Sequence, residues 1–108
     1  MYIVHIQERI GRILEFTAGG RENFLDSPII QDAVLRNFEV IGEAVKQLSA
    51  EIKARYSDVN WRDVAGLRDV LIHNYIGVNL DMVWHIIQDD LPILERTINA
   101  MRTDLESA

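Results

Sequence analysis

The stretch SPIIQDAVLRNFEVIGEAVKQLS, residues 27–49, carries the clearest helix signal in the sequence. Ser27 belongs to the residue types that cap helix N-termini, and Pro28 suits the first helical position because its missing N–H needs no partner there. Apolar residues then recur at helical spacing, which predicts one buried face made of Ile30, Val34, Ile41, Val45 and Leu48. The stretch therefore predicts a long helix packed on a core.

The sequence before this helix predicts another helix and a connection. Apolar residues at helical spacing predict a helix over about residues 2–17, which two successive glycines end. Residues 21–26 read as a loop, and Phe24 and Leu25 within it are expected to anchor the chain to the core.

The sequence after this helix predicts three more helical segments. A short helix is expected over residues 50–56, followed by a turn and a helix that begins at Trp61 with Asn60 as its cap. Asn79 can cap a last helix that runs nearly to the C-terminus. Pro92 inside this last helix predicts a kink or a local break, because proline cannot donate the helical hydrogen bond.

Length and composition indicate one folded domain, residues 1–108. A chain of 108 residues holds one core, and its 48% apolar and 26% charged residues argue against disorder. No segment alternates with the period of a strand. Four main helices and one short helix therefore predict an all-α fold, with a helical bundle as the natural architecture.

Composition also narrows the possible functions. The absence of cysteine excludes disulfides, thiolate catalysis and cysteine zinc sites. We find no signal peptide and no apolar run long enough to span a membrane, so a cytoplasmic protein without a membrane partner is expected. The formal net charge of −6 argues against a protein that coats nucleic acid through many phosphate contacts. It leaves open an enzyme that binds one or two phosphates in a local pocket.

One short window, LRDVLIHNY at residues 67–75, combines three residue types that suit RNA cleavage. Arg68 offers a permanent charge with a forked donor for phosphate, and His73 has an ordinary pKa suited to proton transfer near neutral pH. Tyr75 can donate a hydrogen bond, stack on a base or accept a modification. A base that deprotonates a 2′-hydroxyl and a cation that stabilises the phosphate would suffice to cleave RNA without a metal.

Helical geometry restricts how these three residues can meet. On a straight helix Arg68 and Tyr75 share a face, whereas His73 lies about 140° from Arg68 at 100° per residue. Either the helix unwinds around Asn74 or two copies of the segment meet in a dimer, and we favour a dimer cleft. A structural alternative remains, with a basic group at a helix end, a histidine that complements the helix dipole and an aromatic at the core edge.

Several stretches resemble one family. The pattern Arg-x4-His-x-Tyr formed by Arg68, His73 and Tyr75 looks like the signature of HEPN ribonucleases. Residues 31–44 resemble the second helix of HepT-like toxins. Residues 61–69 and 75–80 resemble the stretch around the active site of these toxins. Residues 83–84 and 90–92 resemble their final helix. The likeness covers nearly the whole chain and is least specific at residues 21–27.

This resemblance implies a fold, an activity and partners. The fold would be a HEPN-type up-down four-helix bundle with one extra short helix, paired as a homodimer in which both motifs face a shared cleft. The activity would be that of an endoribonuclease toxin of a toxin–antitoxin pair, acting on RNA without metal or cofactor. The partner would be an MNT-type nucleotidyltransferase antitoxin, which in this family can transfer AMP to the motif tyrosine.

The resemblance also assigns roles to residues. His73 becomes the base or acid, Arg68 the phosphate clamp, and Tyr75 the cleft residue and AMP acceptor. Residues that could support these three are Asp69, Asn74, Arg36, Asn37 and Glu43. Structural alternatives stand beside some of them: Asn37 lies on an apolar seam, where a buried amide can fix helix register, and Arg36 and Glu43 can form a solvated face.

Two other functions compete with the ribonuclease toxin. The chain could be a non-catalytic docking module that binds a nucleotidyltransferase and is AMPylated by it, a reading that the acidic net charge favours. It could also be an interaction bundle without chemistry, but that reading leaves the motif and its neighbours unexplained.

Overall fold

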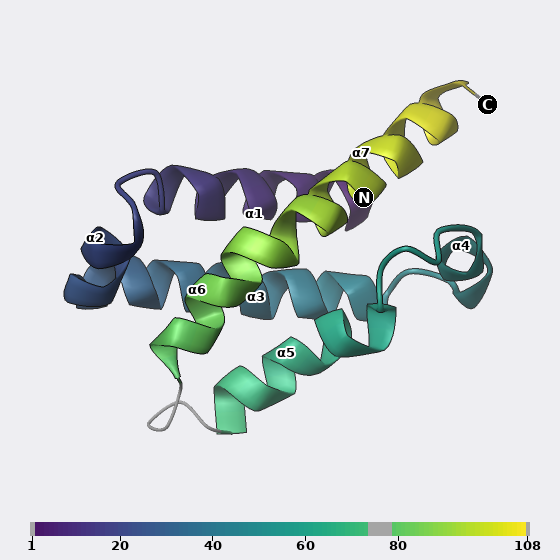
Figure 1. Ribbon diagram of the computed structural model, residues 1–108. Helices are drawn as coiled ribbons and strands as arrows, with labels where there is room; N and C mark the ends of the chain where they lie inside the picture. The colour runs from purple at the N-terminus through teal and green to yellow at the C-terminus, as the bar shows by residue number, and fades with distance from the viewer. Residues whose placement is uncertain (1, 74–78, 108) are drawn as a thin grey trace.

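The computed structural model describes residues 2–73 and 79–107, and every regular element in that part of the chain is a helix (Figure 1). This confirms the predicted all-α class. The elements in chain order are α1 (Tyr2–Phe16), α2 (Arg21–Asp26), α3 (Pro28–Lys46), α4 (Ala50–Arg55), α5 (Trp61–His73), α6 (Leu80–Asp89) and α7 (Leu91–Ser107).

The long helices run alternately up and down. α1 and α3 lie antiparallel and side by side, α5 returns along α3, and the α6–α7 pair runs back across α1 (Figure 1). Counting α6 and α7 as one interrupted helix gives the predicted up-down four-helix bundle. Its dimensions are 44 × 27 × 21 Å, and the C-terminal end of α7 extends beyond the other helices.

The core is built from the apolar faces that the sequence predicts for α1, α3, α6 and α7. Side chains with no exposed surface include Ile6, Ile13, Val34, Ile41, Val45 and Ile98. Ile30, which the periodicity also placed inward, is only partly buried and packs at the edge of this core. None of the described helices is both long and apolar enough to cross a bilayer.

The start of α3 follows its sequence signal, and its end comes slightly early. The Ser27 hydroxyl accepts a hydrogen bond from the Ile30 amide at 3.2 Å, so the predicted cap is confirmed. The helix ends at Lys46 instead of near Ser49, because Ser49 caps α4 and accepts from the Ile52 amide at 3.2 Å. The two helices therefore need a break between them.

The prediction of a loop over residues 21–26 was wrong, because the segment forms α2. It starts after Gly20, whose φ of 94° is a conformation that suits glycine. Phe24 is fully buried as expected, and its ring packs against Trp84 with centroids 5.6 Å apart. A six-residue helix with one core residue has no apolar periodicity to detect, and it gives the bundle two short helices instead of one.

The predicted break in the last helix is confirmed. α6 ends at Asp89 and α7 begins at Leu91, so that Pro92 lies in the first turn of α7, where its missing N–H costs nothing. The Asn79 side chain accepts from the Met82 amide at 3.1 Å, as its predicted role as a cap requires.

Candidate functional site

The helix that carries the motif, α5, is fixed firmly at its N-terminal end. The Asn60 side chain accepts a hydrogen bond from the Asp63 amide at 3.1 Å, which confirms the predicted cap. Trp61 is buried, and its indole N–H donates to the carbonyl oxygens of Tyr56 at 2.9 Å and Lys53 at 3.2 Å. These bonds tie the start of α5 to the end of α4.

α5 is continuous as far as His73 and therefore carries both Arg68 and His73. Five residues apart on an unbroken α-helix, these two positions lie about 140° apart around the axis. Within one protomer, positions 68 and 73 therefore lie on different sides of α5. Asn74 and Tyr75, with the predicted unwinding around Asn74, lie outside the described residues.

Asp69 lies one residue after Arg68 and links α5 to α3. Its carboxylate oxygen lies 3.7 Å from the ammonium nitrogen of Lys46, in the last turn of α3. Both side chains are more than one-third exposed, so the pair contributes less than about 1 kcal/mol to stability. Sequence reasoning missed Lys46, because the two residues belong to different helices and only tertiary packing joins them.

Arg36 and Glu43 share one exposed face of α3, as their spacing predicts. Together with Tyr2 and His5 of α1 they line an open groove of about 440 Å³. Arg36 also donates to the Glu39 carboxylate at 3.3 Å. This exposed setting agrees with the structural alternative for Arg36 and Glu43, which is that they form a solvated face of the helix.

Asn37 is buried between α3 and α1. Its amide nitrogen donates to the Ala33 carbonyl at 2.7 Å, and its amide oxygen accepts from the Arg9 guanidinium at 3.4 Å. The Nε of Arg9 is buried and finds no hydrogen-bond partner among the residues that the structure describes. These contacts suit an amide that fixes the register of α3 against α1.

The structure thus separates the predicted site residues into two groups. Arg68, Asp69 and His73 lie on α5, whereas Arg36, Asn37 and Glu43 lie on α3 and line or contact the α1 side. Among the side chains that the structure describes, no three histidine, aspartate or glutamate residues are grouped to hold a metal ion. The proposed metal-free chemistry stays a prediction.

Comparison with known proteins identifies the family. The profile of the family described as Ribonuclease HepT-like matches residues 6–101. The chain belongs to the HepT-like ribonuclease family. The resemblance inferred from the motif and its flanking stretches is therefore confirmed.

Individual relatives agree with this assignment. A Methanocaldococcus jannaschii protein, named a gamma-glutamylcyclotransferase and candidate RNase, is 38% identical over 107 residues, or 98% of this chain and 48% of the relative. The chain therefore spans about half of that protein. A protein from Caldanaerobacter subterraneus subsp. tengcongensis, named a candidate RNase, is 39% identical over 98 residues, or 90% of this chain and 88% of the relative.

A third HepT-like relative comes from Thermococcus cleftensis and bears the name "Probable ribonuclease HepT". It is 37% identical over 102 residues, which cover 94% of this chain and 93% of the relative. No solved structure matches the chain.

Proposed function

We propose that this protein is a metal-independent endoribonuclease that acts as the toxin of a toxin–antitoxin pair. The observation that carries the proposal is the pair Arg68 and His73 near the C-terminal end of the continuous helix α5, in a chain of the HepT-like ribonuclease family. The RNase names of the relatives support the same reaction class. The toxin role comes from the family resemblance.

The proposed reaction uses a proton acceptor and a cation. His73 takes the proton of a 2′-hydroxyl, whose oxygen forms a bond to the adjacent phosphorus while the bond from phosphorus to the 5′-oxygen breaks. The 5′-oxygen takes a proton from water as it leaves, so the products carry a 2′,3′-cyclic phosphate and a 5′-hydroxyl. Arg68 stabilises the charge that gathers on the phosphate oxygens. DNA lacks the attacking hydroxyl and is not cleaved.

The geometry of α5 supports a site shared by two protomers. Positions 68 and 73 lie about 140° apart around the axis of one helix, so a shared site would let Arg68 of one protomer and His73 of its partner flank one phosphate. A net charge of −6 also fits a local grip on phosphate more than a broad basic surface.

In this proposal a nucleotidyltransferase of the MNT type inhibits the RNA cleavage. It transfers AMP from ATP to Tyr75: the tyrosine hydroxyl loses its proton to solvent, its oxygen bonds to the α-phosphorus, the bond from the α-phosphorus to the bridging oxygen breaks, and pyrophosphate leaves. The new phosphodiester places a bulky anion next to the motif, where it blocks the cleft and repels RNA.

The first test uses total RNA with EDTA present and compares the wild type with His73→Ala. His85→Ala is the matched control, because His85 is exposed on α6 and paired with Asp89 at 2.7 Å. We expect cleavage with cyclic-phosphate ends by the wild type and the control, and a loss of about 100-fold or more in His73→Ala. Equal cleavage by His73→Ala, or intact RNA with every folded protein, would refute the proposal.

The shared cleft has its own test. Subunits with Arg68→Ala and His73→Ala are co-expressed with different tags, and the mixed dimer is purified. If Arg68 and His73 act across the interface, the mixed dimer keeps one intact site and cleaves RNA, although each parent homodimer is inactive. An inactive mixed dimer would place both residues of a site in the same protomer.

The acidic net charge favours a second candidate, a non-catalytic docking module for the nucleotidyltransferase. After co-expression with that enzyme, mass spectrometry should find AMP on Tyr75 and size-exclusion chromatography a stable complex. Absence of both argues against this candidate. Intact RNA with unmodified wild-type protein, together with a stable complex, would favour it over the ribonuclease.

A further inference from the structure

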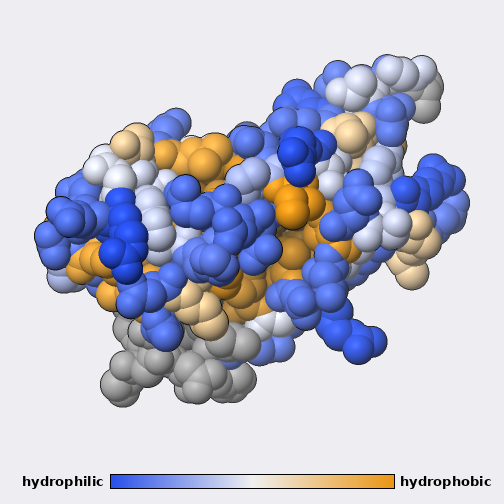
Figure 2. Space-filling view, in the orientation of Figure 1, coloured by the Kyte–Doolittle hydropathy of each residue, from blue (hydrophilic) through white to orange (hydrophobic). Residues whose placement is uncertain are grey.

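A groove separates α5 from the α6–α7 pair. Within the described chain α5 packs extensively only on α3. The space between α5 and the α6–α7 pair forms an open groove of about 380 Å³. Figure 2 shows apolar surface along this boundary, with polar surface around it.

The floor of this groove is apolar and reachable from solvent. Ile86 and Ile93 are half-buried, as are Val64 and Leu67 on the α5 wall. Six apolar residues line the groove, namely Val59, Val64, Leu67, Ile86, Ile93 and Leu94. A helix that laid an apolar stripe on this floor would remove this surface from water.

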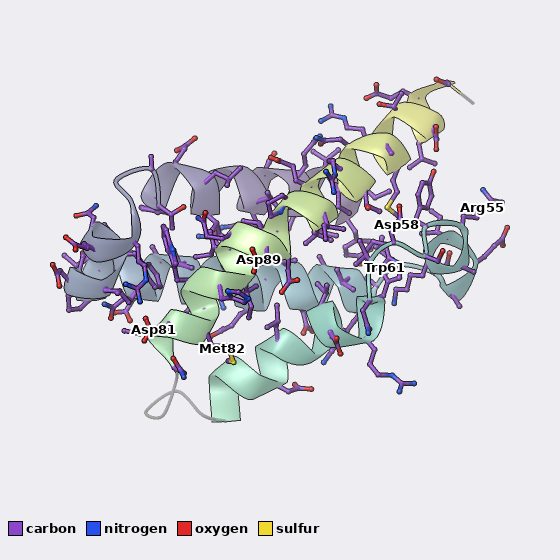
Figure 3. All side chains as sticks on the ribbon, viewed as in Figure 1. Arg55, Asp58, Trp61, Asp81, Met82 and Asp89 are labelled. Carbon is purple, nitrogen blue, oxygen red and sulfur yellow. The ribbon has the colours of Figure 1, made fainter. Side chains whose placement is uncertain are left out.

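The rim of the groove is acidic on both walls. Asp58 and Asp63 lie on the α5 side, Asp90 lies at the α6–α7 junction, and all three are exposed. In Figure 3, Asp58 stands beside the start of α5, near Trp61. Every ionisable residue that lines the groove is an aspartate. The rim therefore attracts cationic side chains over an apolar floor.

We propose that this groove binds a basic amphipathic helix of a partner protein. Apolar residues at helical spacing enter the floor, and lysines or arginines beside them meet the three carboxylates. The volume suits a few side chains of one helix face. A second copy of the chain fits less well, because a two-fold contact would bring one acidic rim against another.

A bound helix would also touch the helix that carries the motif. Val64 and Leu67 belong to α5, and Leu67 directly precedes Arg68. The proposal rests on the groove alone and not on RNA cleavage, so its failure and the failure of the proposed function are separate outcomes.

The test uses a fluorescent synthetic peptide of leucine and lysine with leucines at helical spacing, and a matched peptide with glutamate in place of lysine. Fluorescence anisotropy measures their binding to the full chain at low salt. Two charge variants are compared with the wild type. The rim variant carries Asp58→Asn, Asp63→Asn and Asp90→Asn, and the control variant carries Glu8→Gln, Glu15→Gln and Asp26→Asn.

Both triple variants remove the same number of exposed carboxylates, so only the position of the charge differs between them. We expect the lysine peptide to bind the wild type and the control variant alike and the rim variant about tenfold more weakly. The glutamate peptide should not bind. Equal affinity for the two variants, or equal binding of both peptides, would overturn the proposal, since either result means that the peptide has no specific site on the rim.

Two further measurements address the floor. Backbone amide signals of Val64, Leu67 and Ile86 should shift on peptide titration in NMR spectra, and Ile93→Asn should weaken binding about tenfold or more. Shifts confined to other faces would contradict the proposal. A dimer that Ile93→Asn dissociates, seen by sedimentation, would assign the groove to a second copy and overturn it as well.

Discussion

The buried amide of Asn37 offers a direct test of how α1 and α3 are held together. Replacing Asn37 with leucine keeps a side chain of similar size and removes both hydrogen bonds, to the Ala33 carbonyl at 2.7 Å and from the Arg9 guanidinium at 3.4 Å. Because Asn37 is only 5% exposed, water cannot replace these bonds freely. The substitution therefore tests the amide apart from its volume.

The expected change in the free energy of unfolding is the difference between the lost hydrogen bonds and the apolar burial that leucine gains. Each lost hydrogen bond costs about 1 kcal/mol net, and a part-buried guanidinium that loses its acceptor adds about 1–2 kcal/mol. A buried leucine returns about 1–2 kcal/mol of apolar burial. We expect Asn37→Leu to lower the free energy of unfolding by about 1–3 kcal/mol. Asn37→Ala lacks the returned burial, so it should cost about 3–4 kcal/mol.

Urea and thermal unfolding measure these differences at one fixed protein concentration, since any self-association would tie stability to concentration. A loss of about 1–3 kcal/mol should lower the melting temperature by about 5–15 °C. Arg9→Met and the double substitution Arg9→Met/Asn37→Leu complete a cycle. If Arg9 and Asn37 interact as the 3.4 Å contact indicates, the double variant loses about 0.5–1.5 kcal/mol less than the sum.

A variant Asn37→Leu that equals or exceeds the wild type in stability would refute this reasoning. A measurement of RNA cleavage by the same variant separates the two roles considered for Asn37, in the site and in the register of α3. Loss of RNA cleavage in a stable Asn37→Leu would give the amide a role at the site, whereas loss of stability with cleavage retained supports its role in register.

Other substitutions test smaller features. Phe24→Ala should lower the free energy of unfolding by about 3–5 kcal/mol in urea, because the ring is fully buried, and a change under 1 kcal/mol would mean that α2 does not anchor the core. Gly20→Ala should cost about 1–3 kcal/mol by the same measurement, because φ is 94° there; no change would show that the strain is absent. Ser27→Ala should cost about 1 kcal/mol through the lost cap, and equal stability would argue against the cap bond. Asp69→Asn should change stability by less than about 1 kcal/mol, so RNA cleavage lost with the fold kept would place Asp69 in the reaction.

Elements with local signals could be predicted from the sequence. Ser27 and Pro28 mark the start of α3, Asn60 and Asn79 mark the starts of α5 and α6, and the structure keeps each of these caps. The α2 segment could not be predicted in this way. Its single core residue, Phe24, gives no periodicity, and the helix depends on tertiary contact with Trp84.

The candidate site likewise has a part that the sequence predicts and a part that depends on tertiary packing. Residue type and spacing singled out Arg68 and His73, since their chemistry shows in the sequence itself. The contacts of the supporting residues did not show there. Asp69 meets Lys46 and Asn37 meets Arg9 only because α3 packs between α5 and α1. The sequence spacing of these residues does not predict that they form pairs.

The placement of α5 leaves part of the helix that carries the motif accessible to a second molecule. α5 is capped and anchored at Trp61, packed along α3, and left open toward α6 and α7 over the described residues. Its two motif positions, 68 and 73, lie about 140° apart around the helix axis. A partner that meets this helix at its C-terminal end or along its open side does not have to displace the α1–α3 core. The bundle can thus keep its stability in α1 and α3 while α5 remains available for contacts that complete or restrain a site.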